Sequence, residues 1–141
     1  VGANVEKYPE IYQRVLNEGH SVGNHTYSHK SAWQHRWSAW LADFKKAEKV
    51  IRSNLMRPPY GKIWPWQARR LRALGYKIIM WTFITYDFDP TSDPLKALRK
   101  MNRLKNGSVI VMHDQPKALT HLKVLLPQVL EMFKERRFKP L

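Results

Sequence analysis

The chain has 141 residues, of which 43% are hydrophobic and 12% aromatic, and its formal net charge is +14 at pH 7. This composition excludes an intrinsically disordered chain, and the lack of a long apolar run excludes a membrane-spanning helix within this sequence. Cysteine is absent, which excludes disulfides and thiolate ligands, so any metal must be held by His, Asp or Glu.

The positive charge is spread over all the predicted helices and does not form one block, and aromatic residues do not alternate with it as in a base-stacking platform. We therefore expect solvated basic helix faces and no nucleic acid partner. A charge of +14 would also favour binding to a nucleic acid, an anionic membrane or an anionic glycan. These partners are the alternatives to basic helix faces that contact only solvent.

Five segments have the apolar spacing of amphipathic helices. The first covers residues 8–18, where apolar side chains from Tyr8 to Leu16 recur at helical intervals. The same spacing predicts helices at residues 38–54, 65–74, 93–105 and 121–137. Pro127 lies inside the last of these and either kinks the helix or marks a later start.

Apolar segments between these helices predict four strands, at residues 20–25, 55–58, 76–84 and 108–112. Gly23 in the first strand allows a close approach of another backbone. Strands and helices alternate, successive strands end roughly 30 residues apart, and no two-residue hairpin turn is present. The pattern therefore predicts parallel strands joined by helical crossovers, as in an α/β fold.

Polar motifs follow each predicted strand, at residues 25–29, 57–61, 81–89 and 111–114. The carboxyl ends of parallel strands lie on one face of a β/α barrel, and active sites are built on that face. In the first motif, His25 and His29 are four residues apart, a spacing that can present two imidazoles to one divalent metal. The sequence therefore indicates a functional site on this face.

Three of these motifs, in this order and spacing, resemble the polysaccharide deacetylases of the NodB-homology type, carbohydrate esterase family 4. The motifs are His25-Thr26-Tyr27-Ser28-His29, Arg57-Pro58-Pro59-Tyr60-Gly61 and Val111-Met112-His113-Asp114. The resemblance covers the whole chain. It implies one domain over residues 1–141, with the distorted seven-stranded (β/α) barrel of that family lacking its N-terminal portion.

The resemblance also implies a metal site and a proton donor. His25 and His29 would hold a divalent metal, most often zinc in this family. His113 would be the general acid, and Asp87 would orient it. Hydrolysis of an amide requires such an acid, because an amine leaves poorly unless it is protonated.

Four further residues take roles from the same resemblance. Arg57 would pair with the catalytic base and tune it, and the backbone N–H of Tyr60 would help to hold the oxyanion. Val111, where the family usually has Leu, would line the pocket for the acetyl methyl group. Phe88 stands where the family has Trp and would contact the substrate.

Two departures from the family pattern concern carboxylates. The Thr-Phe-Asp-Asp run that supplies the family's base and third metal ligand is absent, because no Asp or Glu precedes Glu6. Ile84 stands where the fourth motif has its first Asp, while Asp87 remains. One explanation for the first departure is an upstream β/α unit of roughly 30 residues that carries the missing run.

The sequence therefore predicts a metal-dependent hydrolase that removes acetyl groups from an N-acetylated polysaccharide such as peptidoglycan or a chitin-like oligosaccharide. A non-catalytic glycan-binding remnant of the same fold is the alternative, since the Asp-Asp motif is absent. The compartment stays open between a cytoplasmic and a cell-envelope-facing bacterial protein. Most tryptophans are expected to pack in the core or at its rim, although one or two could line a sugar groove; they are Trp33, Trp37, Trp40, Trp64 and Trp66.

Overall fold

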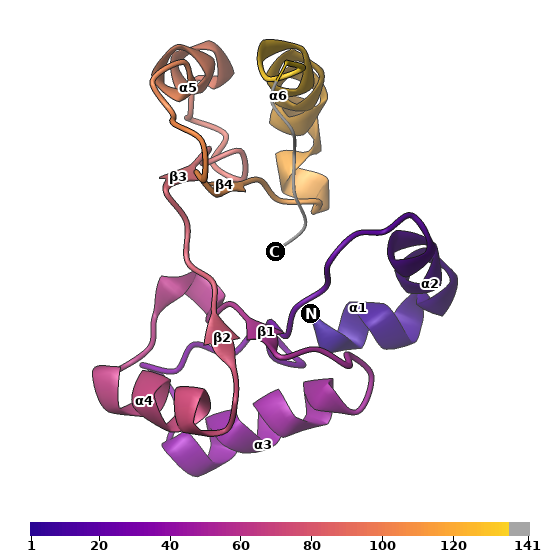
Figure 1. The fold of residues 1–141 in the computed structure, drawn as a ribbon, viewed down its shortest axis with the longest axis vertical. Helices are drawn as coiled ribbons and strands as arrows, with labels where there is room; N and C mark the ends of the chain where they lie inside the picture. The colour runs from indigo at the N-terminus through magenta and orange to yellow at the C-terminus, as the bar shows by residue number, and fades with distance from the viewer. Residues whose placement is uncertain (136–141) are drawn as a thin grey trace. The chain divides into compact units, whose positions relative to one another are not determined.

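The computed structural model describes residues 1–135, which form two compact units (Figure 1). The first unit runs from Val1 to Met80 and the second begins at Trp81. Each unit contains one two-stranded parallel sheet, in agreement with the predicted parallel strands. Among the described residues, the helices are too short or too polar to cross a membrane.

Four α-helices belong to the first unit: α1 (Gly2–Lys7), α2 (Pro9–Asn17), α3 (Trp37–Glu48) and α4 (Pro65–Ala73). The predictions for α2 and α4 are confirmed, and Gly75 adopts a left-handed φ of 87° just beyond α4. The six-residue α1 was not predicted, because it is too short to show helical periodicity. Helix α3 ends six residues before the predicted Asn54, since the chain turns at Lys49 and Val50 to enter the sheet.

The sheet of the first unit pairs β1 (Leu55–Met56) with β2 (Lys77–Ile78). The predicted strand at residues 20–25 was too long: only Asn24 bridges to Met56, in parallel. A Cβ on Gly23 would lie 3.2 Å from the carbonyl oxygen of Leu55, so the predicted close backbone approach is confirmed. Three parallel segments therefore end side by side, and His25 and Arg57 each follow one of them.

Aromatic side chains form the core under this sheet. Trp40 and Phe44 from α3 are buried and stacked, with ring centroids 5.5 Å apart, and they pack with Met56 and Leu71. The indole N–H of Trp40 donates to the carbonyl of Lys30 at 2.9 Å, so its polar atom is satisfied. This core fixes α3 against the segment that carries the two candidate metal ligands.

The second unit pairs β3 (Phe83–Ile84) with β4 (Ile110–Val111), and α5 (Pro94–Met101) and α6 (Leu119–Met132) pack together on a shared apolar core. A short 3-10 helix, Pro116–Ala118, precedes α6. The predicted cap of α5 is confirmed, because the Asp93 carboxylate accepts the N–H of Leu95 at 2.8 Å.

Three boundaries in this part of the chain were wrong. The predicted strand at residues 76–84 is two short strands in separate sheets, because the chain passes from one unit to the other after Met80, which is 41% exposed. Helix α5 ends at Met101, four residues early, in a turn. Helix α6 begins two residues early and ends at Met132, with Pro127 inside it. The predicted end of this helix, at residue 137, lies outside the described residues.

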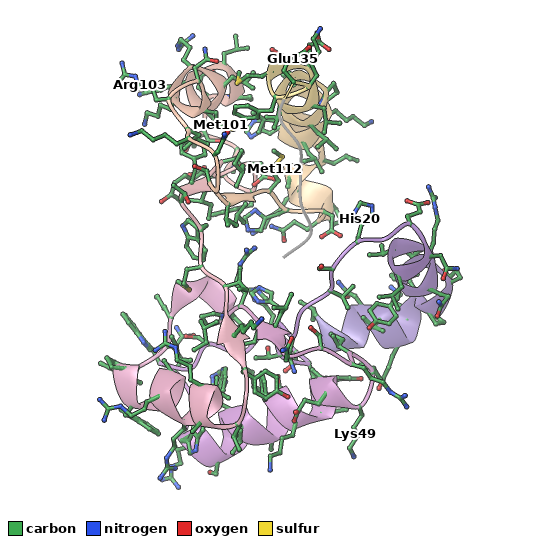
Figure 2. All side chains as sticks on the ribbon, in the orientation of Figure 1. His20, Lys49, Met101, Arg103, Met112 and Glu135 are labelled. Atoms are coloured by element: carbon green, nitrogen blue, oxygen red, sulfur yellow. The ribbon has the colours of Figure 1, made fainter. Side chains whose placement is uncertain are left out.

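Basic side chains project into solvent from both units, as the sequence predicted. Lys49 at the end of α3 and Arg103 after α5 extend away from their own ribbons (Figure 2). The parallel pairs and helical crossovers agree with an α/β fold. The part of the chain that the structure describes shows two parallel pairs of strands, not a closed barrel.

Candidate functional site

The structure places the two histidines of the first motif side by side. The Nε2 atoms of His25 and His29 are 3.2 Å apart, and their rings meet edge to face with centroids 4.8 Å apart. Two residues with a left-handed backbone conformation make this possible. Thr26 (φ 62°) and His29 (φ 59°) fold the segment back on itself. The two imidazoles therefore converge on one point.

The tautomer of His25 is fixed by the backbone. Its Nδ1 lies 2.6 Å from the carbonyl oxygen of Arg57, and because a carbonyl can only accept, Nδ1 carries the proton. Burial lowers the pKa of His25 from 6.5 to about 4, with a smaller contribution from His29. His25 is therefore neutral at pH 7, with the Nε2 lone pair directed toward His29, which is the form that binds a metal.

Asp43 on α3 holds the segment that connects the two histidines. Its carboxylate accepts the backbone N–H groups of Tyr27 and Ser28, each at 3.0 Å, and the Ser28 hydroxyl at 2.6 Å. The Lys30 ammonium lies 3.4 Å away. Burial alone would raise the pKa of Asp43, but the bonds from Ser28 and the charge of Lys30 outweigh it, and the pKa lies below its ordinary value.

The sequence reasoning missed Asp43, although a signal was present. Asp43 lies three residues after Trp40 and four before Ala47, within the apolar face of a predicted helix. A buried charge at such a position needs several partners to be tolerated, and here the partners are the backbone of the histidine segment.

Two further contacts fix the same segment. Asn24 is fully buried, accepts the N–H of Thr26 at 2.8 Å and donates to the carbonyl of Phe44 at 3.1 Å. The first N–H group of α1, from Gly2, donates to the carbonyl of Thr26 at 2.9 Å. A Cβ on Gly2 would lie 2.9 Å from the Tyr27 ring, so only glycine fits there.

The second motif lies next to the histidine pair. Arg57 donates from Nε to the carbonyl of Ile79 at 3.0 Å, and within residues 1–135 it forms no ion pair with a carboxylate. Tyr60 has a left-handed φ of 60° and contacts the His29 ring edge to face at 4.7 Å. The structure thus brings both residues to the end of β1, close to the two imidazoles.

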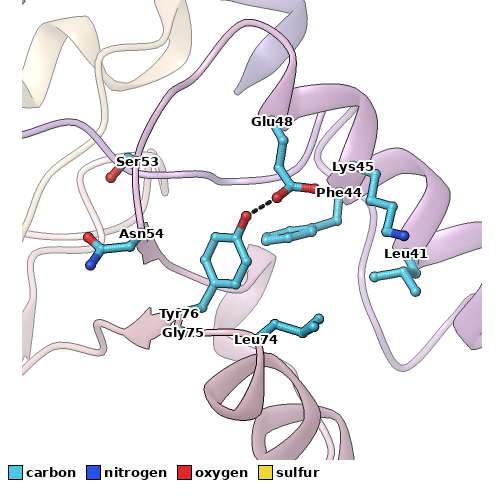
Figure 3. Close-up of a pocket in the computed structure, with 9 residues that line it drawn as sticks. All are labelled: Leu41, Phe44, Lys45, Glu48, Ser53, Asn54, Leu74, Gly75 and Tyr76. Carbon is cyan, nitrogen blue, oxygen red and sulfur yellow. Dashed lines mark hydrogen bonds between the residues drawn. The ribbon is translucent and has the colours of Figure 1, made fainter.

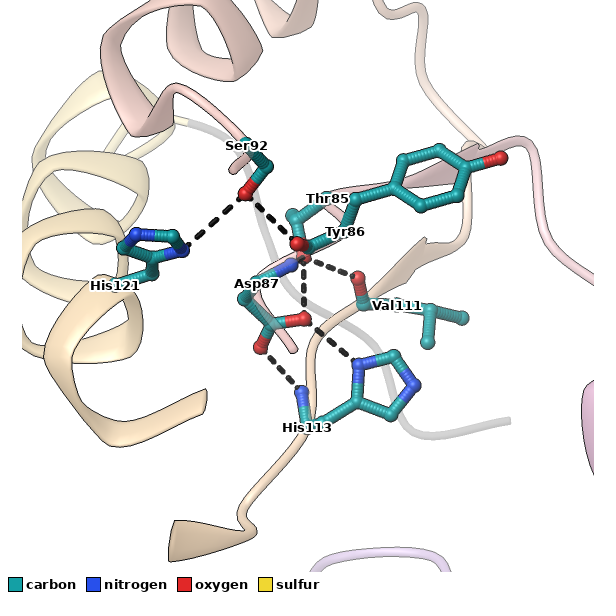
Figure 4. Close-up of polar contacts among 7 residues, drawn as sticks. All are labelled: Thr85, Tyr86, Asp87, Ser92, Val111, His113 and His121. Carbon is teal, nitrogen blue, oxygen red and sulfur yellow. Dashed lines mark hydrogen bonds and ion pairs between the residues drawn. The ribbon is translucent and has the colours of Figure 1, made fainter. Parts of the chain in front are cut away.

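In the second unit, Asp87 and His113 form a close pair at the ends of β3 and β4 (Figure 4). Asp87 is fully buried, and its Oδ1 lies 2.7 Å from Nδ1 of His113. Its Oδ2 accepts the backbone N–H of His113 at 2.6 Å. This geometry places a proton on Nδ1 and leaves Nε2 of the partly exposed imidazole available to exchange a proton.

Thr85 completes this arrangement and was also missed from the sequence. Its hydroxyl lies 2.9 Å from Asp87 Oδ1 and 3.0 Å from the carbonyl oxygen of Val111, which joins the two strand ends (Figure 4). Phe88 packs edge to face on His113, with ring centroids 4.8 Å apart. Val111 is buried, and the role expected for its side chain stays a prediction.

The histidine pair fits a metal in part. Two imidazole nitrogens bound to one tetrahedral zinc at about 2.05 Å each would lie about 3.3 Å apart, close to the 3.2 Å found here. A cluster of three or more His, Cys, Asp or Glu side chains is not present within the described part of the chain. The residues present therefore supply two ligands, and a complete site requires a further donor.

A hollow of about 420 Å³ lies elsewhere in the first unit, between α3 and the end of α4 (Figure 3). The hydroxyl of Tyr76 donates there to the carboxylate of Glu48. Burial and this hydrogen bond raise the pKa of Tyr76. None of the predicted site residues lines this hollow.

Comparisons with known proteins agree with the resemblance seen in the motifs. The family model described as polysaccharide deacetylase matches residues 1–79, which nearly coincide with the first unit. This match covers more than half of the chain. The chain therefore belongs to the polysaccharide deacetylase family.

Individual relatives extend the similarity over the second unit. A peptidoglycan-N-acetylglucosamine deacetylase of Bacillus cereus is 29% identical over 97% of this chain and 58% of its own length. Chitin deacetylase 1 of Saccharomyces cerevisiae is 30% identical over 92% of this chain and 48% of its own. The chain thus spans about half the length of these curated relatives.

A solved structure shows the same fold. The crystal structure of a peptidoglycan N-acetylglucosamine deacetylase superposes with a TM-score of 0.83 at 27% identity, and the match covers 100% of this chain and 70% of that chain.

Proposed function

We propose that this chain carries part of the active site of a metal-dependent deacetylase that hydrolyses the acetamido groups of a polysaccharide, either peptidoglycan or a chitin-like glycan. The observation that carries the proposal is the His25–His29 pair, with Nε2 atoms 3.2 Å apart and the tautomer of His25 set by Arg57. Family membership and the names of the relatives support the same reaction class.

His25 and His29 would hold the metal, for which zinc is the first candidate because imidazole nitrogen is among its preferred ligands. A divalent metal, when bound, supplies Lewis-acid chemistry and a water nucleophile at neutral pH. The backbone contacts of Asp43 and Asn24 would keep the two rings converged before a metal arrives, which lowers the cost of binding.

His113 would act as the general acid. Hydrolysis breaks the C–N bond of the acetamido group, and the departing amine nitrogen takes a proton, which Nε2 of His113 can donate. Asp87 would stabilise the imidazolium and hold the ring in place, as its contacts with Nδ1 and the backbone N–H of His113 allow. Thr85 would orient that carboxylate.

The remaining roles concern the acyl group. The backbone N–H of Tyr60 would stabilise the developing oxyanion, an interaction worth about 3–4 kcal/mol in other hydrolases. Val111 and Phe88 would contact the substrate. Arg57 would tune the catalytic base. In the described residues Arg57 contacts the carbonyl of Ile79 and no such base.

The base and the third metal ligand are expected to be carboxylates, and these 141 residues contain no Asp-Asp pair. We propose that a segment upstream of residue 1 supplies both, at a strand end of the seven-stranded (β/α) barrel that the family resemblance implies. The upstream coding sequence tests this directly: a strand followed by Asp-Asp supports it, and an upstream region without paired acidic residues contradicts it.

A non-catalytic glycan-binding protein of the same fold is the second candidate, favoured by the lack of a third ligand within residues 1–135. An assay of acetate release from acetylated chitin oligomers and peptidoglycan separates the two. Release that stops on chelation and returns with zinc supports the enzyme. Glycan binding without release, in the protein that includes the upstream segment, supports the second candidate.

A further inference from the structure

Two exposed tryptophans stack on each other at the surface of the first unit. The rings of Trp33 and Trp64 have centroids 5.2 Å apart and an interplanar angle of 27°. Their exposed fractions are 51% and 47%, although the core of the same unit buries Trp40 completely. Leaving two paired indoles exposed to water is costly. Apolar surface of this kind therefore usually marks a binding site.

The pair is held in place by buried polar contacts. Trp64 is the N-cap residue of α4, and its backbone N–H donates to Oε1 of Gln67 at 2.9 Å. Gln67 is 1% exposed, and its Nε2 lies 3.5 Å from the carbonyl of Ala32, the residue before Trp33. One buried amide therefore links the backbones of both tryptophan segments, and a surface fixed in this way loses little entropy when it binds a ligand.

The two segments that carry the pair are basic. The ammonium group of Lys62 lies 5.4 Å from the centroid of Trp33. Residues 30–37 and 57–72, which include both tryptophans, contain no Asp or Glu. Lys30 is paired with Asp43, and their other cations are Arg36, Arg57, Lys62, Arg69, Arg70 and Arg72. An anionic ligand with an apolar face complements such a surface.

The same two segments meet at the candidate site. His29 contacts Tyr60, and four residues further along each segment Trp33 contacts Trp64. Four residues of chain span at most about 14 Å. A polymer that reaches the histidine pair can therefore also reach the indoles.

We propose that Trp33, Trp64 and Lys62 form a binding subsite for an acidic glycan. The apolar face of a pyranose ring would lie on the indoles, and a carboxylate on the sugar would pair with Lys62. The inference rests on the proposed function insofar as the glycan is the substrate. It goes beyond that function by selecting a carboxylate-bearing polymer, such as one that contains a lactyl-substituted sugar, over neutral chitin.

Binding to the metal-free 141-residue chain tests the proposal without any dependence on acetate release. Calorimetric titrations with chitobiose and with its disaccharide analogue that bears one lactyl carboxylate should show about tenfold tighter binding of the acidic sugar. Trp33→Ala and Trp64→Ala should each weaken the binding of the acidic sugar about tenfold. Lys62→Met should bind the acidic and the neutral sugar equally, with the affinity for the neutral sugar unchanged. This variant still tests the proposal if an alanine variant unfolds.

The matched controls are Trp66→Ala and Lys77→Met. Trp66 is 47% exposed on α4 and contacts Trp37, not the pair, and Lys77 is an exposed lysine on β2. Both variants should bind the acidic sugar as the unchanged chain does.

Equal affinity of the unchanged chain for the two sugars would overturn the proposal, and so would a loss of affinity in Trp66→Ala equal to that in Trp33→Ala or Trp64→Ala. So would tighter binding of a DNA oligonucleotide through the same residues, or a Trp64-dependent dimer. Acetate release is measured in a separate assay. The binding result can therefore be interpreted even if the protein does not release acetate.

Discussion

A single carboxylate, that of Asp87, binds His113 twice: Oδ1 lies 2.7 Å from the ring Nδ1 and Oδ2 lies 2.6 Å from the backbone N–H. The side chain of Asp87 is completely buried, whereas that of His113 is 32% exposed. The exposed imidazole is therefore held by a charge that water cannot reach, so both its orientation and its tautomer depend on Asp87.

Replacement of the imidazole tests its role as a proton donor. In the metal-loaded protein that includes the proposed upstream segment, His113→Ala should lower kcat by about 10²–10⁴-fold, the usual range for loss of a general acid. The zinc content, measured by atomic absorption, should not change. Loss of zinc in this variant would mean that His113 is a metal ligand.

Replacement of the carboxylate should have a smaller effect in the same direction. Asp87→Asn keeps the shape but removes the negative charge, and we expect kcat to fall about 10–100-fold, as for other residues that orient a reacting group. Asp114→Asn, at the exposed neighbour of His113, is the control and should retain full activity. Equal activity of Asp87→Asn and the unchanged protein would contradict the orienting role.

The histidine pair should bind zinc weakly in this chain. Structural and catalytic zinc sites take three or four protein ligands, and residues 1–135 offer two at this position. Isothermal titration should give a dissociation constant well above the nanomolar range, and His25→Ala should abolish the binding. Nanomolar affinity would instead require a third ligand within these 141 residues.

Asp43 should be important for stability as well as for the site. Asp43→Ala removes the acceptor of the Ser28 backbone N–H and of the Ser28 hydroxyl, while the Tyr27 N–H keeps the Asp43 carbonyl oxygen at 3.2 Å, and we expect the free energy of unfolding to fall by about 2–4 kcal/mol. Asp93→Ala, which removes an exposed helix cap, should cost about 1 kcal/mol. Urea denaturation compares the two variants. Equal losses would show that Asp43 is not a special support of the histidine segment.

Acid should destabilise the chain through His25. Its pKa is about 4 when folded, below its ordinary value of 6.5, so the unfolded chain binds the proton more tightly. The contribution of His25 is therefore complete above pH 6.5 and is lost as the pH falls from 6.5 toward 4. The lowered pKa of Asp43 acts with the same sign in a more acidic range, below its ordinary value of 3.8.

Urea midpoints at pH 7.5 and pH 5 measure this effect. The midpoint should fall with acid in the unchanged chain and fall less in His25→Asn. An identical decrease in both proteins would assign the acid sensitivity to other groups.

Local signals in the sequence were sufficient for several elements. The caps and turns of α4 and α5 depend on neighbouring residues such as Asp93 and Gly75, so their positions could be predicted. The apolar run at residues 76–84 could not be divided, because nothing within it marks the change from one unit to the other. The roles of His25, His29 and His113 were assigned from motifs and stay predictions, while the structure shows that His25 lies beside His29 and His113 beside Asp87. Asp43 was missed because its partners Tyr27 and Ser28 lie 15 or 16 residues away in the chain, and Thr85 because its contact with Val111 joins residues 26 apart.

Acetate release by the protein that includes the proposed upstream segment tests the central proposal most directly. With acetylated chitin oligomers or peptidoglycan as substrate, we expect release that is abolished by a chelator, restored by zinc, and lost in both His25→Ala and His113→Ala. The 141-residue chain alone should release little or none, since it contains no Asp-Asp pair. Release that persists without metal or without His25 would contradict the proposed reaction, and robust release by the 141 residues alone would contradict the upstream carboxylates.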